Sequence, residues 1–345
     1  MTFIPLQYKA AGHDGSFQSL DGSLFIKPTT SQEVEFYNYI QHDKSLKDEV
    51  AYGDCLVDWV PEYIGTLHPG ASDDLIQQGG ENLDESLIRK AEDTLEIEGS
   101  DKQYLILKNI LEGYSQPSVM DIKLGSILYD ENSSPEKVKR MQAVSKTTTS
   151  GSLKFRIAGM IIKDDFNGKA PENLDGVDMS QVCDSKIKPG FFTFNRYFGR
   201  KLKDHNVIDA LKIFFRYNNL PLHVQDKIIA NFHTRLQMLY NCLLDEEIRV
   251  ISGSLLFVFE NDIKRWEMEN FHDPIISPPT VADHDDEDEE CSSSSSNSSS
   301  DEDIQKELSC LKLIDFAHAK STPEKGYDEE LVTGIENLFN IIGSL

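Results

Sequence analysis

The 345-residue chain lacks the cysteine spacing of a zinc site. Its five cysteines are scattered, at Cys55, Cys183, Cys242, Cys291 and Cys310. An odd number of cysteines without a Cys-x-x-Cys pair argues against structural zinc and against a disulfide framework. No apolar run reaches the roughly 18 residues that span a bilayer, and the N-terminus lacks the apolar stretch of a signal peptide. We therefore expect a reduced, soluble, intracellular protein.

Positive charge is also scarce. The chain has 34 Lys and Arg against 59 Asp and Glu, a formal net charge of -25. Nucleic acid would be repelled by such a surface, so an anionic ligand would need a local basic patch. Residues 283–303 contain ten acidic residues, eight serines and no Lys or Arg. We expect 280–303 to be disordered, either as a solvated spacer or as a docking segment for basic partners.

One apolar run, residues 119–124, is interrupted by Asp121 and Lys123. In a strand, a spacing of two places both side chains on the same face. A carboxylate beside an ammonium group suits phosphoryl transfer, because one can accept a hydroxyl proton while the other neutralises the phosphoryl group. Gly125 allows a sharp turn directly afterwards. By itself, such a pair is more often a solvated ion pair on a surface strand.

Near the N-terminus, Asp14-Gly15 and Asp21-Gly22 separate short apolar stretches and predict successive hairpins. Lys27 lies on the strand that follows. Kinase-like folds cover ATP phosphates with a glycine-bearing hairpin and hold them with such a lysine. An ordinary β-meander with an exposed lysine is the alternative that these residues leave open.

Several other segments have clear local patterns. Ser31 is predicted to cap a helix, and Ser134, followed by proline, predicts a second helix start. Apolar residues at helical spacing predict core helices over 207–215 and 224–243. Residues 248–260 are predicted to form one buried strand.

Four motifs resemble those of the inositol polyphosphate kinase family and occur in its order. They are Pro-x-x-x-Asp-x-Lys-x-Gly at 117–125, Tyr-Phe-Gly-Arg at 197–200, Ser-Leu-Leu-Phe-Val at 254–258 and Ile-Asp-Phe-Ala-His at 314–318. The segment between Gly125 and Ser150 is short, which resembles the multikinase branch of the family. Lys154 stands where relatives commonly have glycine, so the turn there departs from the family pattern.

The resemblance implies an α/β (α+β) fold with two lobes, related to protein kinases. Residues 1–110 would form an N-lobe, an antiparallel sheet plus a helix with an acidic insertion at 71–102. Residues 111–345 would form a larger C-lobe, with an inositol-phosphate-binding segment at 130–150 and the acidic tract at 280–303.

The resemblance also implies ATP and Mg²⁺ as cofactors. The implied cofactor-binding residues are Lys27, Glu33, Asn109, Glu112 and Asp315. Lys27 would hold phosphates and pair with Glu33, with Glu35 as the alternative partner. Asn109 or Glu112 would contact the nucleoside. Asp315, at the end of an apolar strand and before Phe316, resembles the metal-binding Asp of protein kinases.

The remaining implied roles concern the acceptor. Asp121 would orient or deprotonate the hydroxyl, with Lys123 beside the transferring phosphate. The implied substrate contacts are Lys123, Lys137, Arg140, Lys146, Arg200 and His318. Ser254 would support the site. A polyphosphate requires several cations at once, and the run from Lys137 to Lys146 is the dense basic cluster that follows the signature strand.

As a multikinase, the chain would convert inositol 1,4,5-trisphosphate to tetrakis- and pentakisphosphate. Alternatives are a selective trisphosphate 3-kinase, a hexakisphosphate kinase, or a scaffold of a transcription complex. The resemblance implies a nuclear and cytoplasmic location, with transcription-factor partners reached through 283–303. Phosphoinositide head groups are a further possible substrate. Direct nucleic-acid binding and a membrane span are not expected.

Overall fold

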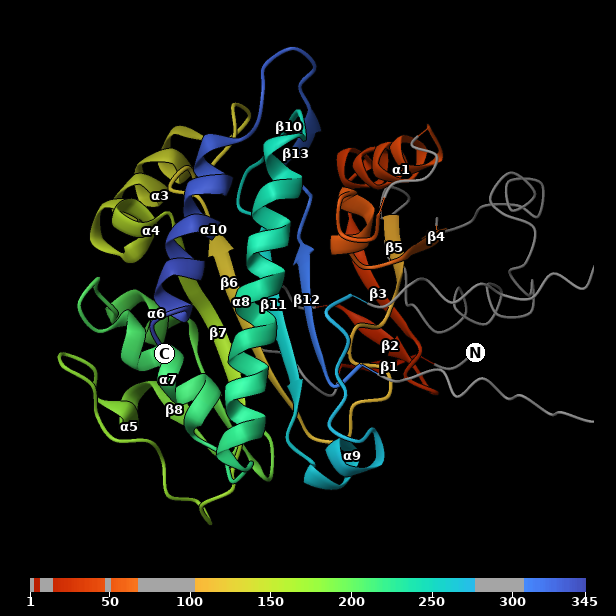
Figure 1. Ribbon diagram of the computed structural model, residues 1–345. Coiled ribbons are helices and arrows are strands. Elements are labelled where there is room, and N and C mark those ends of the chain that lie inside the picture. The colour runs from red at the N-terminus through yellow and green to blue at the C-terminus, as the bar shows by residue number, and fades with distance from the viewer. Residues whose placement is uncertain (1–2, 7–14, 47–50, 68–102, 277–306) are drawn as a thin grey trace, which may run out of the picture.

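The computed structural model describes residues 3–6, 15–46, 51–67, 103–276 and 307–345. Within these residues, an antiparallel five-stranded sheet lies beside an antiparallel six-stranded sheet that is covered by helices (Figure 1). This arrangement is the α+β class that the sequence predicts. The acidic insertion at 71–102, the tract at 280–303 and the turn at Asp14 lie outside the described residues.

The five-stranded sheet is built from segments that are far apart in the sequence. Its strands are β1 (Phe3–Pro5), β2 (Phe17–Ser19), β3 (Leu24–Thr29), β4 (Tyr63–Leu67) and β5 (Gln103–Lys108), in the order β1-β2-β3-β5-β4. The predicted turn at Asp21-Gly22 is present between β2 and β3, where Gly22 has a φ of 81°. Helix α1 (Ser31–Leu46) follows β3, but its cap is Thr30 and not Ser31 as predicted, because Oγ1 of Thr30 accepts from the amide of Glu33 at 3.2 Å. It packs Tyr37 into the core, and a short 3-10 helix (Leu56–Trp59) follows.

The six-stranded sheet contains the signature strand near its centre. Its strands are β6 (Pro117–Leu124), β7 (Phe155–Lys163), β8 (Cys183–Asp184), β9 (Phe191–Phe194), β11 (Ser254–Glu260) and β12 (Ser309–Ile314), in the order β12-β11-β6-β7-β9-β8. Because β6 has a neighbour on each side, both edges of its backbone are hydrogen-bonded. This pairing makes β6 a rigid support for the charged side chains it carries.

The helices of this part of the chain are α3 (Pro135–Thr147), α4 (Thr149–Leu153), α5 (Met179–Val182), α6 (Arg196–Lys201), α7 (Val207–Arg216), α8 (Leu222–Leu244), α9 (Ile263–Met268) and α10 (Glu329–Ile342). Helices α7, α8 and α10 bury apolar residues in the main core, whereas α3 buries none. Helices α8 and α10 pack side by side in front of the sheet, as Figure 1 shows. The predicted core helices over 207–215 and 224–243 are therefore confirmed as α7 and α8. Among the described residues, none of the helices is both long enough and apolar enough to cross a membrane.

The prediction of one strand over 248–260 is wrong. The chain forms β10 (Ile248–Val250), breaks, and resumes as β11. The break contains Ser252, which has a φ of 60° in the left-handed region. Strand β10 pairs instead with β13 (Ala319–Ser321), in a separate two-stranded ribbon. The apolar run looks continuous in the sequence because both strands are buried, although they belong to different sheets.

Candidate active site

Strand β6 points its alternate side chains in two directions. Met120, Ile122 and Leu124 enter the main core, while Asp121 and Lys123 lie on the other face. A β-bulge distorts the pairing with β7 next to Asp121, since Asp121 pairs with Gly159 and Ile122 with Ile157. Bulges redirect side chains and often occur beside active sites. The period of two that the sequence shows is thus realised in the structure.

Asp121 is a buried carboxyl group with only 4% of its surface exposed. Its Oδ1 atom has no hydrogen-bond partner among the described residues. Burial raises the pKa of Asp121 to about 6, against the opposing attraction of Lys123 and with a further upward contribution from Asp315. A carboxyl group with this pKa is ionised at neutral pH and is still a useful proton acceptor. The orphaned Oδ1 is therefore suited to receive a hydroxyl proton from a ligand.

Lys123 is held beside Asp121 by the break before β11. Its Nζ atom donates to the backbone oxygen of Ser252 at 3.1 Å and to Oγ of Ser254 at 3.5 Å. Ser254 is fully buried and pairs with Lys123 across β6 and β11. The left-handed turn at Ser252 thus presents a carbonyl oxygen to the ammonium group. The break in the strand thus supplies one of the oxygens that hold Lys123.

Lys27 of β3 lies between two carboxylates. Its Nζ is 2.7 Å from Oε1 of Glu33 and 3.3 Å from Oδ1 of Asp315. Burial lowers the pKa of Lys27, but Asp315 and Glu33 outweigh that effect and the pKa lies above its ordinary value. Lys27 is therefore a fixed cation. Glu33 is the partner in the structure, whereas the alternative, Glu35, is exposed.

Asp315 connects the two sheets electrostatically. It directly follows β12, and its φ of 67° lies in the left-handed region. One oxygen faces Lys27, while the other is 3.8 Å from Nζ of Lys123. Among the described residues, no three His, Cys, Asp or Glu side chains come together in a way that could hold a metal ion by themselves. Asp315 fits a magnesium ion as one carboxylate ligand, because this ion usually takes its remaining ligands from phosphates and water.

The two residues predicted to contact a nucleoside lie after β5. Nδ2 of Asn109 donates to the backbone oxygen of Gly22 at 2.7 Å, and its Oδ1 accepts from the amide of Leu111 at 3.1 Å. The Asn109 side chain therefore joins the β2–β3 turn to the segment that links the two sheets. Glu112 is exposed in that segment. Of the two, Asn109 contacts the hairpin that carries Lys27.

The predicted basic cluster lies on α3, which starts where the sequence indicates. Oγ of Ser134 accepts from the amide of Lys137 at 3.2 Å and caps the helix. Lys137 is half-buried, and Arg140 and Lys146 are exposed. No residue of α3 is fully buried. The helix therefore lies on the surface and presents its cations to solvent rather than packing them into the core.

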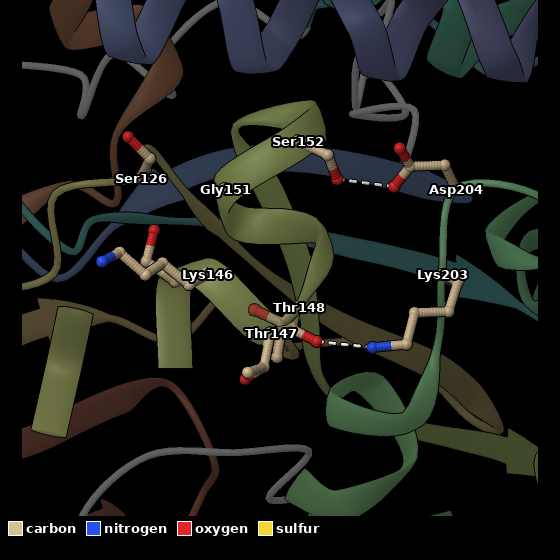
Figure 2. Close-up of a pocket in the computed structure, with 9 residues that line it drawn as sticks. Ser126, Lys146, Thr147, Thr148, Gly151, Ser152, Lys203 and Asp204 are labelled. Atoms are coloured by element: carbon tan, nitrogen blue, oxygen red, sulfur yellow. Dashed lines mark hydrogen bonds between the residues drawn. The ribbon is translucent and has the colours of Figure 1, made fainter. Parts of the chain in front are cut away.

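A polar cavity of about 550 Å³ lies between the end of α3 and the loop after α6, as Figure 2 shows. It is lined by Ser126, Ser145, Lys146, Thr147, Thr148, Gly151, Ser152, Lys203 and Asp204. Lys146 is the predicted substrate contact that faces it. Nζ of Lys203 donates to the backbone oxygen of Thr147 at 2.5 Å. The lining is therefore polar, with the Lys146 and Lys203 ammonium groups, several hydroxyls and one carboxylate, Asp204, which accepts from the Ser152 hydroxyl at 2.5 Å.

Arg200 stands in the last turn of α6, and beside it is a second arginine that the sequence analysis missed. Arg156 of β7 is only 6% exposed and pairs with Lys123 across β6 and β7. Burial lowers the pKa of Arg156, and the neighbouring Arg200 lowers it further. Nε of Arg200 is buried without a hydrogen-bond partner among the described residues. A charged residue inside an apolar strand was the sequence signal that marks Arg156 as unusual.

His318 lies three residues beyond Asp315 and before β13. Its Nδ1 atom is 2.6 Å from Oδ2 of Asp130. About a third of the His318 side chain is exposed.

The structure thus brings Lys27, Asp121, Lys123 and Asp315 into one charged centre. Arg200 and Arg156 neighbour that centre, whereas Lys137, Arg140, Lys146 and His318 have no direct contact with it.

A profile of the inositol polyphosphate kinase family matches residues 104–343. The chain belongs to this family. Its sequence is 42% identical over 351 residues to that of the inositol polyphosphate multikinase of Saccharomyces cerevisiae. This match covers 97% of this chain and 96% of that protein. It is 30% identical over 254 residues to the multikinase of Schizosaccharomyces pombe, covering 73% of this chain and 78% of that protein. The resemblance inferred from the motifs is confirmed.

Solved structures of the inositol polyphosphate kinase family have the same fold. The S. cerevisiae inositol phosphate multikinase, crystallised with ADP and Mn²⁺, matches with a TM-score of 0.68 and 34% identity, covering 94% of this chain and 99% of that chain. A second inositol phosphate multikinase structure matches with a TM-score of 0.51 and 18% identity, over 90% of this chain and 98% of that chain. The second match bears on the fold alone. Together they confirm the predicted fold class.

Proposed function

We propose that this chain is an inositol polyphosphate multikinase that transfers the γ-phosphoryl group of Mg-ATP to hydroxyls of inositol phosphates. The substrate would be inositol 1,4,5-trisphosphate, and the products the tetrakis- and pentakisphosphate. One observation carries the proposal: buried Asp121, with its unpartnered Oδ1, lies beside a chain of ion pairs that joins Glu33, Lys27, Asp315 and Lys123. The likeness to two fungal multikinases supports it.

The charged centre divides the reaction between its side chains. Asp121 accepts or orients the proton of the attacking hydroxyl at Oδ1. Lys123 neutralises the phosphoryl group as it moves, and Lys27 holds the nucleotide phosphates, with Glu33 fixing the position of its ammonium group. Asp315 is the carboxylate that would hold magnesium. A bound magnesium ion would neutralise charge on the phosphate oxygens.

The acceptor would be held by cations from several elements. Lys137, Arg140 and Lys146 come from α3, and Arg200 and His318 from distant parts of the chain. We add Arg156, whose buried guanidinium lies on the same sheet as Asp121. Bidentate guanidinium groups recognise phosphate well, and several cations are needed for a polyphosphate. The polar cavity, which Lys146 lines, leaves room for a further group, so phosphoinositide head groups are the second substrate class to test.

We also propose the organisation around this site. Residues 1–110 would act as an N-lobe that binds nucleotide, with Asn109 or Glu112 near the nucleoside. Residues 111–345 would act as a C-lobe that binds the acceptor. The tract at 283–303 would bind transcription-factor partners in the nucleus, and its deletion would then abolish that binding. If partner binding survives the deletion, the tract is a spacer.

The first test is to incubate the purified chain with Mg-ATP and inositol 1,4,5-trisphosphate and to separate the products by chromatography. We expect successive tetrakis- and pentakisphosphate peaks from the wild type. Asp121→Asn removes the proton acceptor, so kcat should fall by about 10²–10⁴-fold. Glu267→Gln, at an exposed carboxylate on α9, is the matched control and should leave the rate unchanged.

Each alternative function has its own outcome in this experiment. A single tetrakisphosphate peak would indicate a selective 3-kinase, and turnover of the hexakisphosphate would indicate a pyrophosphate-forming kinase. A protein that binds ATP but forms no product would instead be a scaffold. Asp121→Asn turning over at the wild-type rate would remove Asp121 from the mechanism.

A further inference from the structure

Asp130 is a carboxylate to which no role has been assigned, and it has a specific donor on each oxygen. Its Oδ1 accepts from the hydroxyl of Ser133 at 2.6 Å, and its Oδ2 lies 2.6 Å from Nδ1 of His318. Its own amide donates to Oγ of Ser133 at 3.2 Å. With both oxygens engaged, the carboxylate has one preferred orientation. Its side chain is 16% exposed, less than that of His318.

These contacts join two segments that are far apart in the sequence. Asp130 belongs to the loop between β6 and α3, four residues before the Ser134 cap of α3. His318 follows Asp315, the proposed metal ligand. A second ion pair, Glu131 to Lys320 at 3.2 Å, connects the same segments but is largely exposed. The helix that carries the acceptor-binding lysines is thus tied to the segment that carries His318.

The pair with Asp130 determines how His318 meets a ligand. An imidazole ring has two distinct nitrogens, and a bond at one of them fixes the ring orientation and leaves the other to act. Nδ1 is engaged by Asp130, while Nε2 has no hydrogen bond to the described residues. The Ser133 hydroxyl, followed by His318, lowers the pKa of Asp130 despite the opposing effect of burial, so the carboxylate stays ionised as the Nδ1 acceptor.

We propose that Asp130 is a positioning residue that holds the His318 ring so that Nε2 contacts the inositol phosphate. This inference rests on the proposed function. It assigns Asp130 no contact with the substrate itself. Its effect is exerted through His318, so the two residues should act as one unit in binding the acceptor.

The test compares steady-state kinetics of four variants with inositol 1,4,5-trisphosphate and ATP. Asp130→Ala should raise KM for the inositol phosphate about tenfold, the scale of one lost hydrogen bond to a charged group, with kcat and KM for ATP within about twofold. Asp130→Asn keeps an acceptor oxygen for Nδ1 and should recover most of the affinity. Glu131→Ala removes the adjacent carboxylate and its ion pair, and should leave KM unchanged. His318→Ala should raise KM at least as much as Asp130→Ala.

The double variant Asp130→Ala/His318→Ala decides between positioning and a general structural role. Its KM should equal that of His318→Ala alone, because no ring remains to be positioned. Multiplied effects in the double variant would overturn the proposal, as would an equal KM increase in Glu131→Ala. An unchanged KM in Asp130→Ala, with an active wild type, would overturn this inference and leave the proposed function intact. A wild type that phosphorylates no inositol phosphate would overturn both.

Discussion

At the scale of single residues, Asp121 places function and stability in conflict. A buried carboxylate loses hydration, and here Lys123 and Arg156 only partly compensate, so its pKa is raised to about 6. At neutral pH, Asp121 is therefore negatively charged inside the fold, although the fold would be more stable with its carboxyl group protonated. Active sites commonly retain such groups because the reaction needs them.

The pKa of Asp121 predicts how its replacement changes stability. The pKa is about 6 in the fold against an ordinary 3.8, so the folded chain binds this proton more tightly than the unfolded chain does. The contribution of this bound proton to the free energy of unfolding is present in full below about pH 4 and is lost as pH rises through about 6. The change amounts to at most about 3 kcal/mol. Asp121→Asn should therefore raise the free energy of unfolding by about 1–3 kcal/mol at pH 7.5, and progressively less toward pH 4.

Urea unfolding at several pH values measures this difference. Glu267→Gln, at an exposed carboxylate, should show no comparable gain at any pH. A loss of stability in Asp121→Asn at pH 7.5 would show that its ion pairs outweigh its desolvation.

Lys154 is a second residue whose conformation has a local cause. It is not a glycine, yet its φ of 58° lies in the left-handed region. Such a conformation costs a side chain about 1–2 kcal/mol. Its Nζ donates to Oε1 of Glu330 at 2.8 Å and to Oγ of Ser126 at 2.9 Å, while its backbone oxygen accepts from the amide of Gly125. The two side-chain bonds of Lys154 are contacts that a glycine would lack, whereas the backbone bond to Gly125 would remain.

At the scale of elements, the position of Arg200 depends on how closely α6 approaches β7. Gly199 lies at the contact, where an added Cβ atom would stand 1.7 Å from the backbone oxygen of Ile157. Neither backbone can yield without shifting a whole helix or a central strand. Close packing of α6 on β7 therefore requires a glycine at this position of the Tyr-Phe-Gly-Arg motif. The same packing fixes the position of the arginine that follows it.

Gly199→Ala should accordingly destabilise the fold by about 3 kcal/mol through overpacking, and it should raise KM for the inositol phosphate by displacing α6. Gly326→Ala is the comparison. An added Cβ there meets nothing within 4 Å, and the strain of its φ of 64° should cost about 1 kcal/mol. Chemical denaturation of both variants gives the two free energies. Equal losses would contradict the role assigned to the α6–β7 contact.

At the scale of the whole molecule, the described residues just before and just after positions 277–306 are held together at one buried point. Oδ1 of Asp273 accepts from the amides of Leu308 and Ser309, each at 3.0 Å. Arg235 lies 3.7 Å from Asp273 and donates to the backbone oxygens of Pro274 and Ser309. The residues before and after the segment are therefore held by the same buried ion pair, independently of the residues between them.

Replacing 277–306 with a linker of about eight Gly and Ser residues should preserve kcat. It should also leave the free energy of unfolding equal or up to about 1 kcal/mol higher, because a shorter loop loses less entropy on folding. Asp273→Asn should instead lower the free energy of unfolding by about 3 kcal/mol, since the buried Arg235 would keep its bonds to backbone oxygens but lose its counter-charge. Thermal unfolding and kinase assays of both variants test this. A large loss of stability or activity on deletion would show that the tract supports the fold.

Local patterns determined much of this protein. The period of two in residues 119–124 correctly placed Asp121 and Lys123 on one face, and Ser134 caps α3 as predicted. The apolar stripes of α7 and α8 also follow directly from spacing, and the motifs identified the family. These features could be predicted because each depends on residues within one element, whose geometry repeats every two or 3.6 residues.

Only the tertiary structure decided which elements meet. Lys27 and Asp315 are 288 positions apart, and their contact exists because β3 and the end of β12 lie on either side of one site. Other features likewise depend on contacts between elements, which no local sequence pattern predicts. They are the burial of Arg156, the break at Ser252 and the pair of Asp130 with His318. A sequence reports the preferences of each element, whereas burial, ion pairing and pKa depend on how the elements pack together.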